Sequence, residues 1–252
     1  MFRYALTRQP APNFAQGITT SQLGAPDYTR MLTQHAAYED TLRSLGLEII
    51  HLEALEGYPD AYFVEDTAVV MPELAVITRP GASTRQGEET SIAQSLAAYR
   101  TLATIQPPGT LEGGDVFLVG KHLYIGISER TNQSGAQQLA ELAAPHGYQA
   151  TFIPVGAGLH LKSSVNPISE DTLLVTQDFA SREEFASFKK IILHPDEEYA
   201  ANTLRINDHL LTPAGFPLTR EQLEKLGLPI IELEISEVQK MDGGLTCMSL
   251  RF

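Results

Sequence analysis

The stretch LEGGDVFLVGKHLYIGIS, residues 111–128, holds the unit from which this 252-residue chain is built. A polar residue, Glu112, and a pair of glycines precede a short apolar strand. Gly120-Lys121 then offers a tight hairpin turn into a second strand. A helical pattern follows over Asn132–His146, with apolar residues at helical spacing. The order strand, turn, strand and helix predicts a small mixed α/β unit.

The same kind of unit recurs along the chain, each time with one polar residue beside a short apolar strand. These polar residues lie at intervals of 47, 48, 42 and 45 residues. They are Glu65 in FVEDTAVV, Glu112 in LEGGDVFLV, His160 in GLHLKSSV, Asn202 in AANTLRI and Cys247 in GGLTCMSL. Regular spacing in this range indicates repeated supersecondary units.

Turn and helix signals complete the units. We expect further hairpin turns at Glu170-Asp171 and Asn207-Asp208. A longer helix is expected over about Tyr28–Leu45, ended by Gly46. The remaining helical patterns cover Gly87–Leu102, Arg182–Lys190 and Thr219–Leu226.

These elements predict ββαβ modules arranged around an axis with five-fold pseudo-symmetry. Helices in every unit exclude an all-β propeller. The final strand, CMSLRF, cannot complete a unit alone, so we expect it to pair with the N-terminal strand RYALTR and close the ring. Nothing divides the chain, and we expect one catalytic domain over 1–252. An ordinary mixed α/β domain is the alternative.

Composition narrows the classes of function. A net charge of −13 repels phosphate backbones, which argues against a nucleic-acid partner, and mildly favours a cationic small molecule. The longest apolar runs are too short to span a membrane, and the N-terminus lacks the apolar core of a signal peptide. A single cysteine permits no internal disulfide, so we expect a reducing, cytoplasmic setting.

A closed ring would bring the five polar residues to one central channel. Cys247, His160 and the carboxylate of Glu112 are then the parts of an activated-thiol site. The thiolate attacks, the imidazole moves protons and the acid orients the imidazole. Taken alone, a single cysteine is more often an inert buried residue. The repeated placement of all three favours catalysis.

Charged residues near these positions suggest the substrate. Asp60, Glu65 and Asp66 suit a cation, although strand alternation sends the last two to opposite faces unless the strand is twisted or bulged. Arg85 and Arg130 lie in loops after strands, where each can hold a carboxylate. This set fits a small zwitterion with a cationic head, such as an arginine-like amino acid.

No metal or cofactor is expected. One cysteine and scattered histidines do not make a closed zinc site. The chain has neither a phosphate-binding loop nor a dinucleotide fingerprint.

Seven stretches resemble the dimethylarginine dimethylaminohydrolases, which belong to a guanidine-modifying superfamily with arginine deiminases and amidinotransferases. They are FVEDTAVV, ITRPGASTRQGE, LEGGDVF, YIGISERTN, LHLKS, YAANTLRIN and MDGGLTCMSLRF. The resemblance covers nearly the whole chain. It implies a five-bladed α/β propeller with its active site in the central channel.

The resemblance also implies a role for each matching residue. Cys247 matches the nucleophile, His160 the general acid and base, and Glu112 its carboxylate partner. The substrate-binding positions are Glu65 and Asp66 for the guanidinium, Arg85 and Arg130 for the α-carboxylate, Asp60 for the α-amino group, and the backbone carbonyls of Ile18 and Met241. The implied reaction converts dimethylarginine or monomethylarginine to citrulline through a covalent thiouronium on Cys247.

Two other functions stay open at this point. In the first alternative, the chain is a related enzyme that acts on arginine, citrulline or another guanidino compound. In the second, it binds a ligand without catalysis. The intact set of Cys247, His160 and Glu112 argues against the second. A homodimer is compatible with the sequence, although no surface for it is identified.

Overall fold

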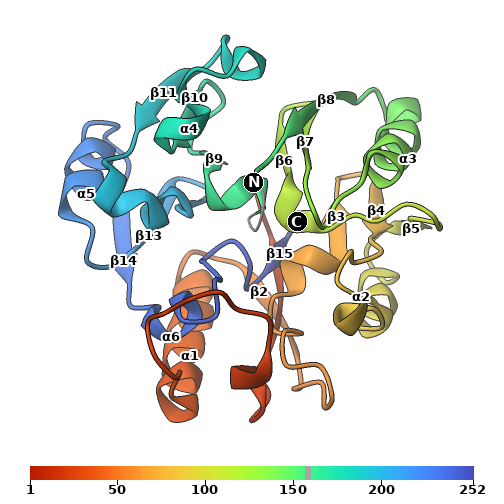
Figure 1. Ribbon diagram of the computed structural model, residues 1–252, viewed down its shortest axis with the longest axis horizontal. Coiled ribbons are helices and arrows are strands. Elements are labelled where there is room, and N and C mark those ends of the chain that lie inside the picture. The colour runs from red at the N-terminus through yellow and green to blue at the C-terminus, as the bar shows by residue number, and fades with distance from the viewer. Residues whose placement is uncertain (157–159) are drawn as a thin grey trace.

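Five sheets of three strands each surround a central axis in the computed structural model, which describes residues 1–156 and 160–252 (Figure 1). The ring is mixed α/β, as expected, with helices on its outer side. Both chain ends lie near the middle of the ring in this view.

The first sheet orders its strands as β15 (Leu250–Arg251), β1 (Tyr4–Arg8) and β2 (Glu48–Leu52). The second holds β3 (Ala68–Val70), β4 (Leu74–Ile77) and β5 (Thr101–Thr104), and the third β6 (Val116–Val119), β7 (His122–Ile127) and β8 (Gln149–Pro154). The fourth holds β9 (Val165–Pro167), β10 (Thr172–Val175) and β11 (Lys189–Ile192), and the fifth β12 (Leu204–Ile206), β13 (His209–Pro213) and β14 (Ile230–Leu233).

Each sheet repeats one topology, an antiparallel pair followed by a parallel third strand. Parallel pairing requires a crossover between the second and third strands. The α-helices are α1 (Tyr28–Ser44), α2 (Glu89–Leu96), α3 (Gln133–Ala143), α4 (Gln177–Ala180), α5 (Pro217–Glu224) and α6 (Ser236–Gln239). The first five lie in such crossovers, so the predicted ββαβ modules are confirmed.

Short 3-10 helices supply many of the remaining turns. They are η1 (Phe14–Gln16), η2 (Val64–Thr67), η3 (Ser83–Arg85), η4 (Gly113–Asp115), η5 (Ala144–His146), η6 (Leu161–Ser163), η7 (Glu183–Phe185) and η8 (Pro195–Ala201).

The ring closes through the two ends of the chain. β1 pairs antiparallel with β15, with Ala5 opposite Arg251 and Leu6 opposite Leu250. The predicted pairing of the terminal strands is therefore confirmed. This pairing covers one edge of β1 and completes the module formed by β15, β1 and β2.

The turn residues occupy the conformations that their positions require. Gly120 and Asn207 have φ of 58° and 50° between the strands of their hairpins. Asp27 caps α1 by accepting the backbone N–H of Arg30, and Gly46 follows its end with φ of 87°. The hairpin turns and the helix end at Gly46 were predicted from the sequence, whereas the cap at Asp27 was not.

The predicted helix over Arg182–Lys190 is wrong. The helical turn comes earlier, in α4, and residues 183–185 form only the short η7. Lys189 already pairs with Thr172 in the sheet, which leaves no room for a longer helix. Phe185 is buried against Phe117 and Tyr124, and this packing holds the segment in its irregular form.

The core is divided among several apolar clusters that lie between neighbouring sheets and helices. One cluster joins Leu6 to Val64, Ile77 and Leu250, and so links the closing sheet to the next one. Within the described residues, no helix has the length and apolar character needed to cross a membrane.

Shortening a side chain at the ring closure is expected to destabilise the whole fold. Leu6→Ala removes a fully buried side chain between two sheets and should cost about 2–5 kcal/mol in the free energy of unfolding. Chemical denaturation would measure the loss. The control is Leu23→Ala, where 57% of the residue is exposed, and which should change stability little. Equal losses in both variants would contradict the proposed closure.

Candidate active site

Four of the five recurring polar residues lie on or beside 3-10 turns that line the axis. Glu65 belongs to η2, Glu112 immediately precedes η4, His160 precedes η6, and Asn202 follows η8. Successive turns in this series contact one another. Cys247 lies in the loop before β15, and its carbonyl accepts the backbone N–H of Glu65 at 3.1 Å. The ring thus gathers all five positions, as the repeat spacing predicts.

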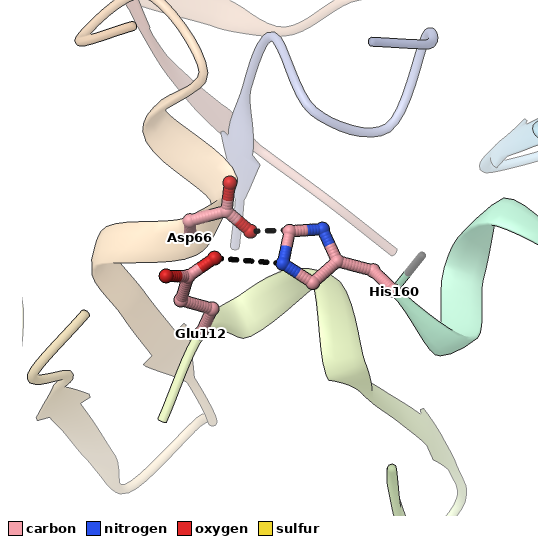
Figure 2. A group of neighbouring side chains, drawn as sticks. All are labelled: Asp66, Glu112 and His160. Atoms are coloured by element: carbon pink, nitrogen blue, oxygen red, sulfur yellow. Dashed lines mark hydrogen bonds and ion pairs between the residues drawn. The ribbon is translucent and has the colours of Figure 1, made fainter. Parts of the chain in front are cut away.

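His160 and Glu112 form the central pair of the site. Nε2 of His160 lies 2.7 Å from Oε2 of Glu112, whose side chain is fully buried (Figure 2). On the other side of the ring, Nδ1 lies 3.9 Å from Oδ1 of Asp66. Burial opposes the charged imidazole, but Asp66, Glu112 and Asp115 outweigh it and raise the pKa of His160 to about 9. His160 is therefore an imidazolium at neutral pH.

Gly114 makes room for this pair. A Cβ built on Gly114 would lie 2.6 Å from Nδ1 of His160 and 2.7 Å from Oδ1 of Asp66. Its backbone N–H also donates to Asp66 at 2.9 Å. Gly114 thus lets the imidazole and the Asp66 carboxylate approach the main chain closely.

Asp66 links the histidine to a buried arginine. Its Oδ2 lies 2.6 Å from Nη1 of Arg85, and Arg85 also pairs with Glu88 at 2.8 Å. Burial opposes ionisation of Asp66, but His160 and Arg85 together lower its pKa to about 2. The Arg85 side chain is only 4% exposed and also donates to the backbone carbonyls of Asp60 and Phe63. Most of its donors therefore serve protein partners.

Arg130 is the more accessible of the two predicted arginines. Its Nη1 lies 3.4 Å from Oε2 of Glu112, and 28% of its side chain is exposed. A guanidinium with one edge on a buried carboxylate and another toward solvent keeps donors free for a ligand.

Glu65 and Asp66 turn toward different partners, since they lie on η2 rather than on a strand. Oε1 of Glu65 receives the ammonium of Lys162 at 2.7 Å and Nη2 of Arg251 at 3.0 Å. Its Oε2 is buried and has no hydrogen-bond partner among the described residues. One acceptor of Glu65 is therefore open among the described residues, which is uncommon for a buried polar atom.

The loop that carries Cys247 is held from several sides. Tyr38 donates to the carbonyl of Leu245, and Thr246 receives and gives hydrogen bonds to the side chain of Asn202. Arg251 donates to the carbonyl of Thr246 at 2.9 Å. These contacts fix the position of Cys247, which is itself partly exposed.

The thiol of Cys247 is protonated at rest. Burial raises its pKa to about 12, and the carboxylates of Glu65 and Asp66 act in the same direction. Lys162 opposes them. A ligand that brings positive charge to this place would favour the thiolate.

The three remaining predicted positions, Asp60, Ile18 and Met241, lie on three separate segments. Both oxygens of the buried Asp60 carboxylate accept the backbone N–H of Ile18, at 3.0 and 3.1 Å. The side chain of Ile18 is partly exposed, whereas Met241 is buried in an apolar cluster with Phe63. Asp60 thus fixes the Ile18 segment in this structure.

Asp66, Glu112 and His160 also offer ligand atoms that lie within 4.8 Å of one another. Such a group could approach a metal ion. Here both carboxylates already pair with arginines, and His160 carries a proton that a metal would have to displace.

Sequence reasoning missed three charged residues of the site: Glu88, Lys162 and Arg251. Each follows a predicted site residue closely, since Glu88 comes three positions after Arg85, Lys162 two after His160 and Arg251 four after Cys247. Closeness in sequence to a predicted site residue was the signal that could have identified these three residues.

Comparison with known proteins connects this geometry to a family. A family model described as N,N dimethylarginine dimethylhydrolase, eukaryotic, matches residues 22–251. The chain is 40% identical to the N(G),N(G)-dimethylarginine dimethylaminohydrolase of Pseudomonas aeruginosa over 254 residues, which covers 100% of both chains.

Solved structures show the same likeness. A cysteine-to-serine variant of the Pseudomonas aeruginosa enzyme complexed with citrulline matches with a TM-score of 0.97 at 40% identity, over 100% of both chains. A dimethylarginine dimethylaminohydrolase adduct with S-methyl-L-thiocitrulline gives the same TM-score, identity and coverage.

The charge state of His160 can be measured directly. NMR titration of the imidazole should give a pKa of about 9 in the native chain. Glu112→Gln should lower that pKa by about one unit or more, because it removes an anion that stabilises the imidazolium. Glu129→Gln, at an exposed position in the next loop, is the control and should leave the titration unchanged. A pKa near 6.5 in the native chain would contradict the described network.

Proposed function

The chain belongs to the dimethylarginine dimethylaminohydrolase family, and from this membership we propose that it hydrolyses Nω-methylated arginines to citrulline and the corresponding methylamine. The observation that carries the proposal is the 2.7 Å contact between His160 and the buried Glu112, in the series of contacting turns that reaches Cys247 through the backbone of Glu65. A positioned imidazolium can give its proton to a departing amine, and the neutral imidazole left behind can then activate water.

The first half of the reaction begins with a neutral thiol. Entry of the guanidinium offsets the negative charge of Glu65 and Asp66, and the proton of Cys247 is lost to solvent. The thiolate then attacks the guanidinium carbon and forms a tetrahedral adduct. The bond to the methylated nitrogen breaks as the imidazolium of His160 gives its proton to the departing amine. A thiouronium remains on Cys247.

The second half uses His160 in the opposite sense. The neutral imidazole takes a proton from water as the water attacks the thiouronium carbon. The carbon–sulfur bond then breaks and the hydroxyl proton of the adduct passes to the sulfur, which frees citrulline and restores the neutral thiol of Cys247. Glu112 orients the ring in both halves and stabilises the imidazolium each time it forms.

The amino-acid end of the substrate requires its own contacts. Arg130 supports binding of the α-carboxylate best, because its guanidinium is partly exposed, while Arg85 contributes positive charge from behind Asp66. We assign the α-amino group to Asp60 and to the backbone carbonyls of Ile18 and Met241. The open Oε2 of Glu65 and the Asp66 carboxylate then serve the guanidinium.

We further propose that residues 1–252 work as one catalytic domain, since each of the five sheets contributes a residue to the site. Its partner is a small guanidino amino acid, which the net charge of −13 favours over nucleic acid. A thiol nucleophile suits a reducing compartment such as the cytoplasm. A homodimer stays a prediction.

A product assay distinguishes this function from that of a relative that acts on other guanidines. Dimethylarginine and monomethylarginine should yield citrulline with dimethylamine and methylamine, whereas arginine and citrulline should react little. Cys247→Ser should reduce citrulline formation by a factor of at least about 10³, because the nucleophile is lost. Ammonia from arginine with no reaction of dimethylarginine would contradict the substrate. Full activity in Cys247→Ser would contradict the mechanism.

A further inference from the structure

Glu65 presents a conflict within the proposed function. A carboxylate beside Cys247 favours a bound guanidinium, yet the same charge opposes formation of the thiolate. Glu65 lies close to this cysteine, since its backbone N–H donates to the Cys247 carbonyl at 3.1 Å. The site therefore needs a way to keep the acceptor while limiting its charge.

Two cations meet the same oxygen of Glu65. The ammonium of Lys162 lies 2.7 Å from Oε1, and Nη2 of Arg251 lies 3.0 Å from it. All three side chains are at least about nine-tenths buried, where an ion pair is little screened by salt. Because both cations approach Oε1, Oε2 keeps its lone pairs free.

Lys162 and Arg251 differ in the other contacts that they make. Arg251 also donates to the carbonyls of Thr246 and Ser249, at 2.9 and 2.6 Å, and so supports the loop on either side of Cys247. The Lys162 ammonium has Glu65 as its ion-pair partner. A change at Lys162 therefore tests charge with less disturbance of the loop than a change at Arg251.

Lys162 and Glu65 belong to different modules of the ring, since Lys162 lies before β9 and Glu65 before β3. Lys162 lies on η6, two residues after His160, and the side-chain amides of Asn166 and Asn202 donate to its carbonyl. Its side chain lines a cavity of about 550 Å³ that Glu65, Thr246 and Arg251 also line. Open space beside the lysine can admit water or a different side chain in its place, so removal of the ammonium should not force the wall to shift.

We propose that Lys162 is a positioning residue of this enzyme, which offsets the charge of Glu65 so that Glu65 accepts a guanidinium without opposing the Cys247 thiolate. The inference rests on the proposed function for its purpose. Its physical content, a charge balance among Lys162, Glu65 and Cys247, can be measured without substrate.

The test is the rate at which iodoacetamide alkylates Cys247, followed by mass spectrometry between pH 8 and 10. The chain has a single cysteine, so each adduct reports this position. Lys162→Met should slow alkylation by about tenfold, and Glu65→Gln should accelerate it by a similar factor, since a neighbouring charge shifts a pKa by about one unit. The double variant restores the charge balance and should react within about threefold of the native chain.

Two further variants separate charge from structure. Lys162→Arg keeps the charge and should alkylate at about the native rate. Lys189→Met removes a surface lysine with the same 2.7 Å distance to a carboxylate, that of Asp171, and should have no effect. Thermal unfolding of each variant confirms that it is folded.

A Lys162→Met variant that alkylates at the native rate would overturn the inference. So would a double variant as slow as Lys162→Met, because a packing defect at Lys162 is not repaired by a change at Glu65. Neither outcome bears on whether the native chain forms citrulline, so failure of this inference and failure of the proposed function are distinct results.

Discussion

The site depends on a row of ionisable, mostly buried side chains in which acidic and basic groups alternate. The row runs Glu88, Arg85, Asp66, His160, Glu112 and Arg130, with neighbouring charged atoms 2.6 to 3.9 Å apart. An isolated charge at such depth costs several kcal/mol, so each member requires the next. The pKa of each carboxylate in the row depends on how many cations flank it. Burial raises that of Glu88, at the end, to about 7, whereas two flanking cations lower that of Asp66 to about 2.

The row joins three of the five sheets. Its members come from different sheets: Asp66 and Arg85 from the segments around β3 and β4, Glu112 from the start of β6, and His160 from the turn before β9. Closure through β1 and β15 then brings Cys247 beside Glu65. The ion pairs of Asp66 with Arg85 and of Arg85 with Glu88 form within one module, whereas His160 gains its carboxylate partners, Asp66 and Glu112, from two other modules.

Much of this architecture could be predicted from the sequence, because it follows from local signals. The spacing of Glu65, Glu112 and Cys247 predicted the ring, and glycine or asparagine at hairpin turns predicted strand pairs. The helix over Arg182–Lys190 failed because sheet pairing and the burial of Phe185 overrode a helical pattern. Glu88 pairs with Arg85 only three residues away, so its role was within reach of the sequence. The roles of Lys162 and Arg251, which pair with Glu65 from other segments, could not be predicted from local pattern. An ion pair between two sheets depends on how closely the sheets approach, which leaves no periodic trace in the sequence.

In the resting site the Cys247 thiol is neutral while His160 is an imidazolium, and we propose that a cationic substrate is needed to form the thiolate. Thiolate absorbance at 240 nm tests it most directly, taken as the difference between the native chain and Cys247→Ser across a pH titration without ligand. With the pKa of Cys247 raised to about 12, no thiolate signal should develop between pH 6 and about 10. A thiolate that forms with a midpoint near pH 7 would show a preformed thiolate–imidazolium pair and contradict the account.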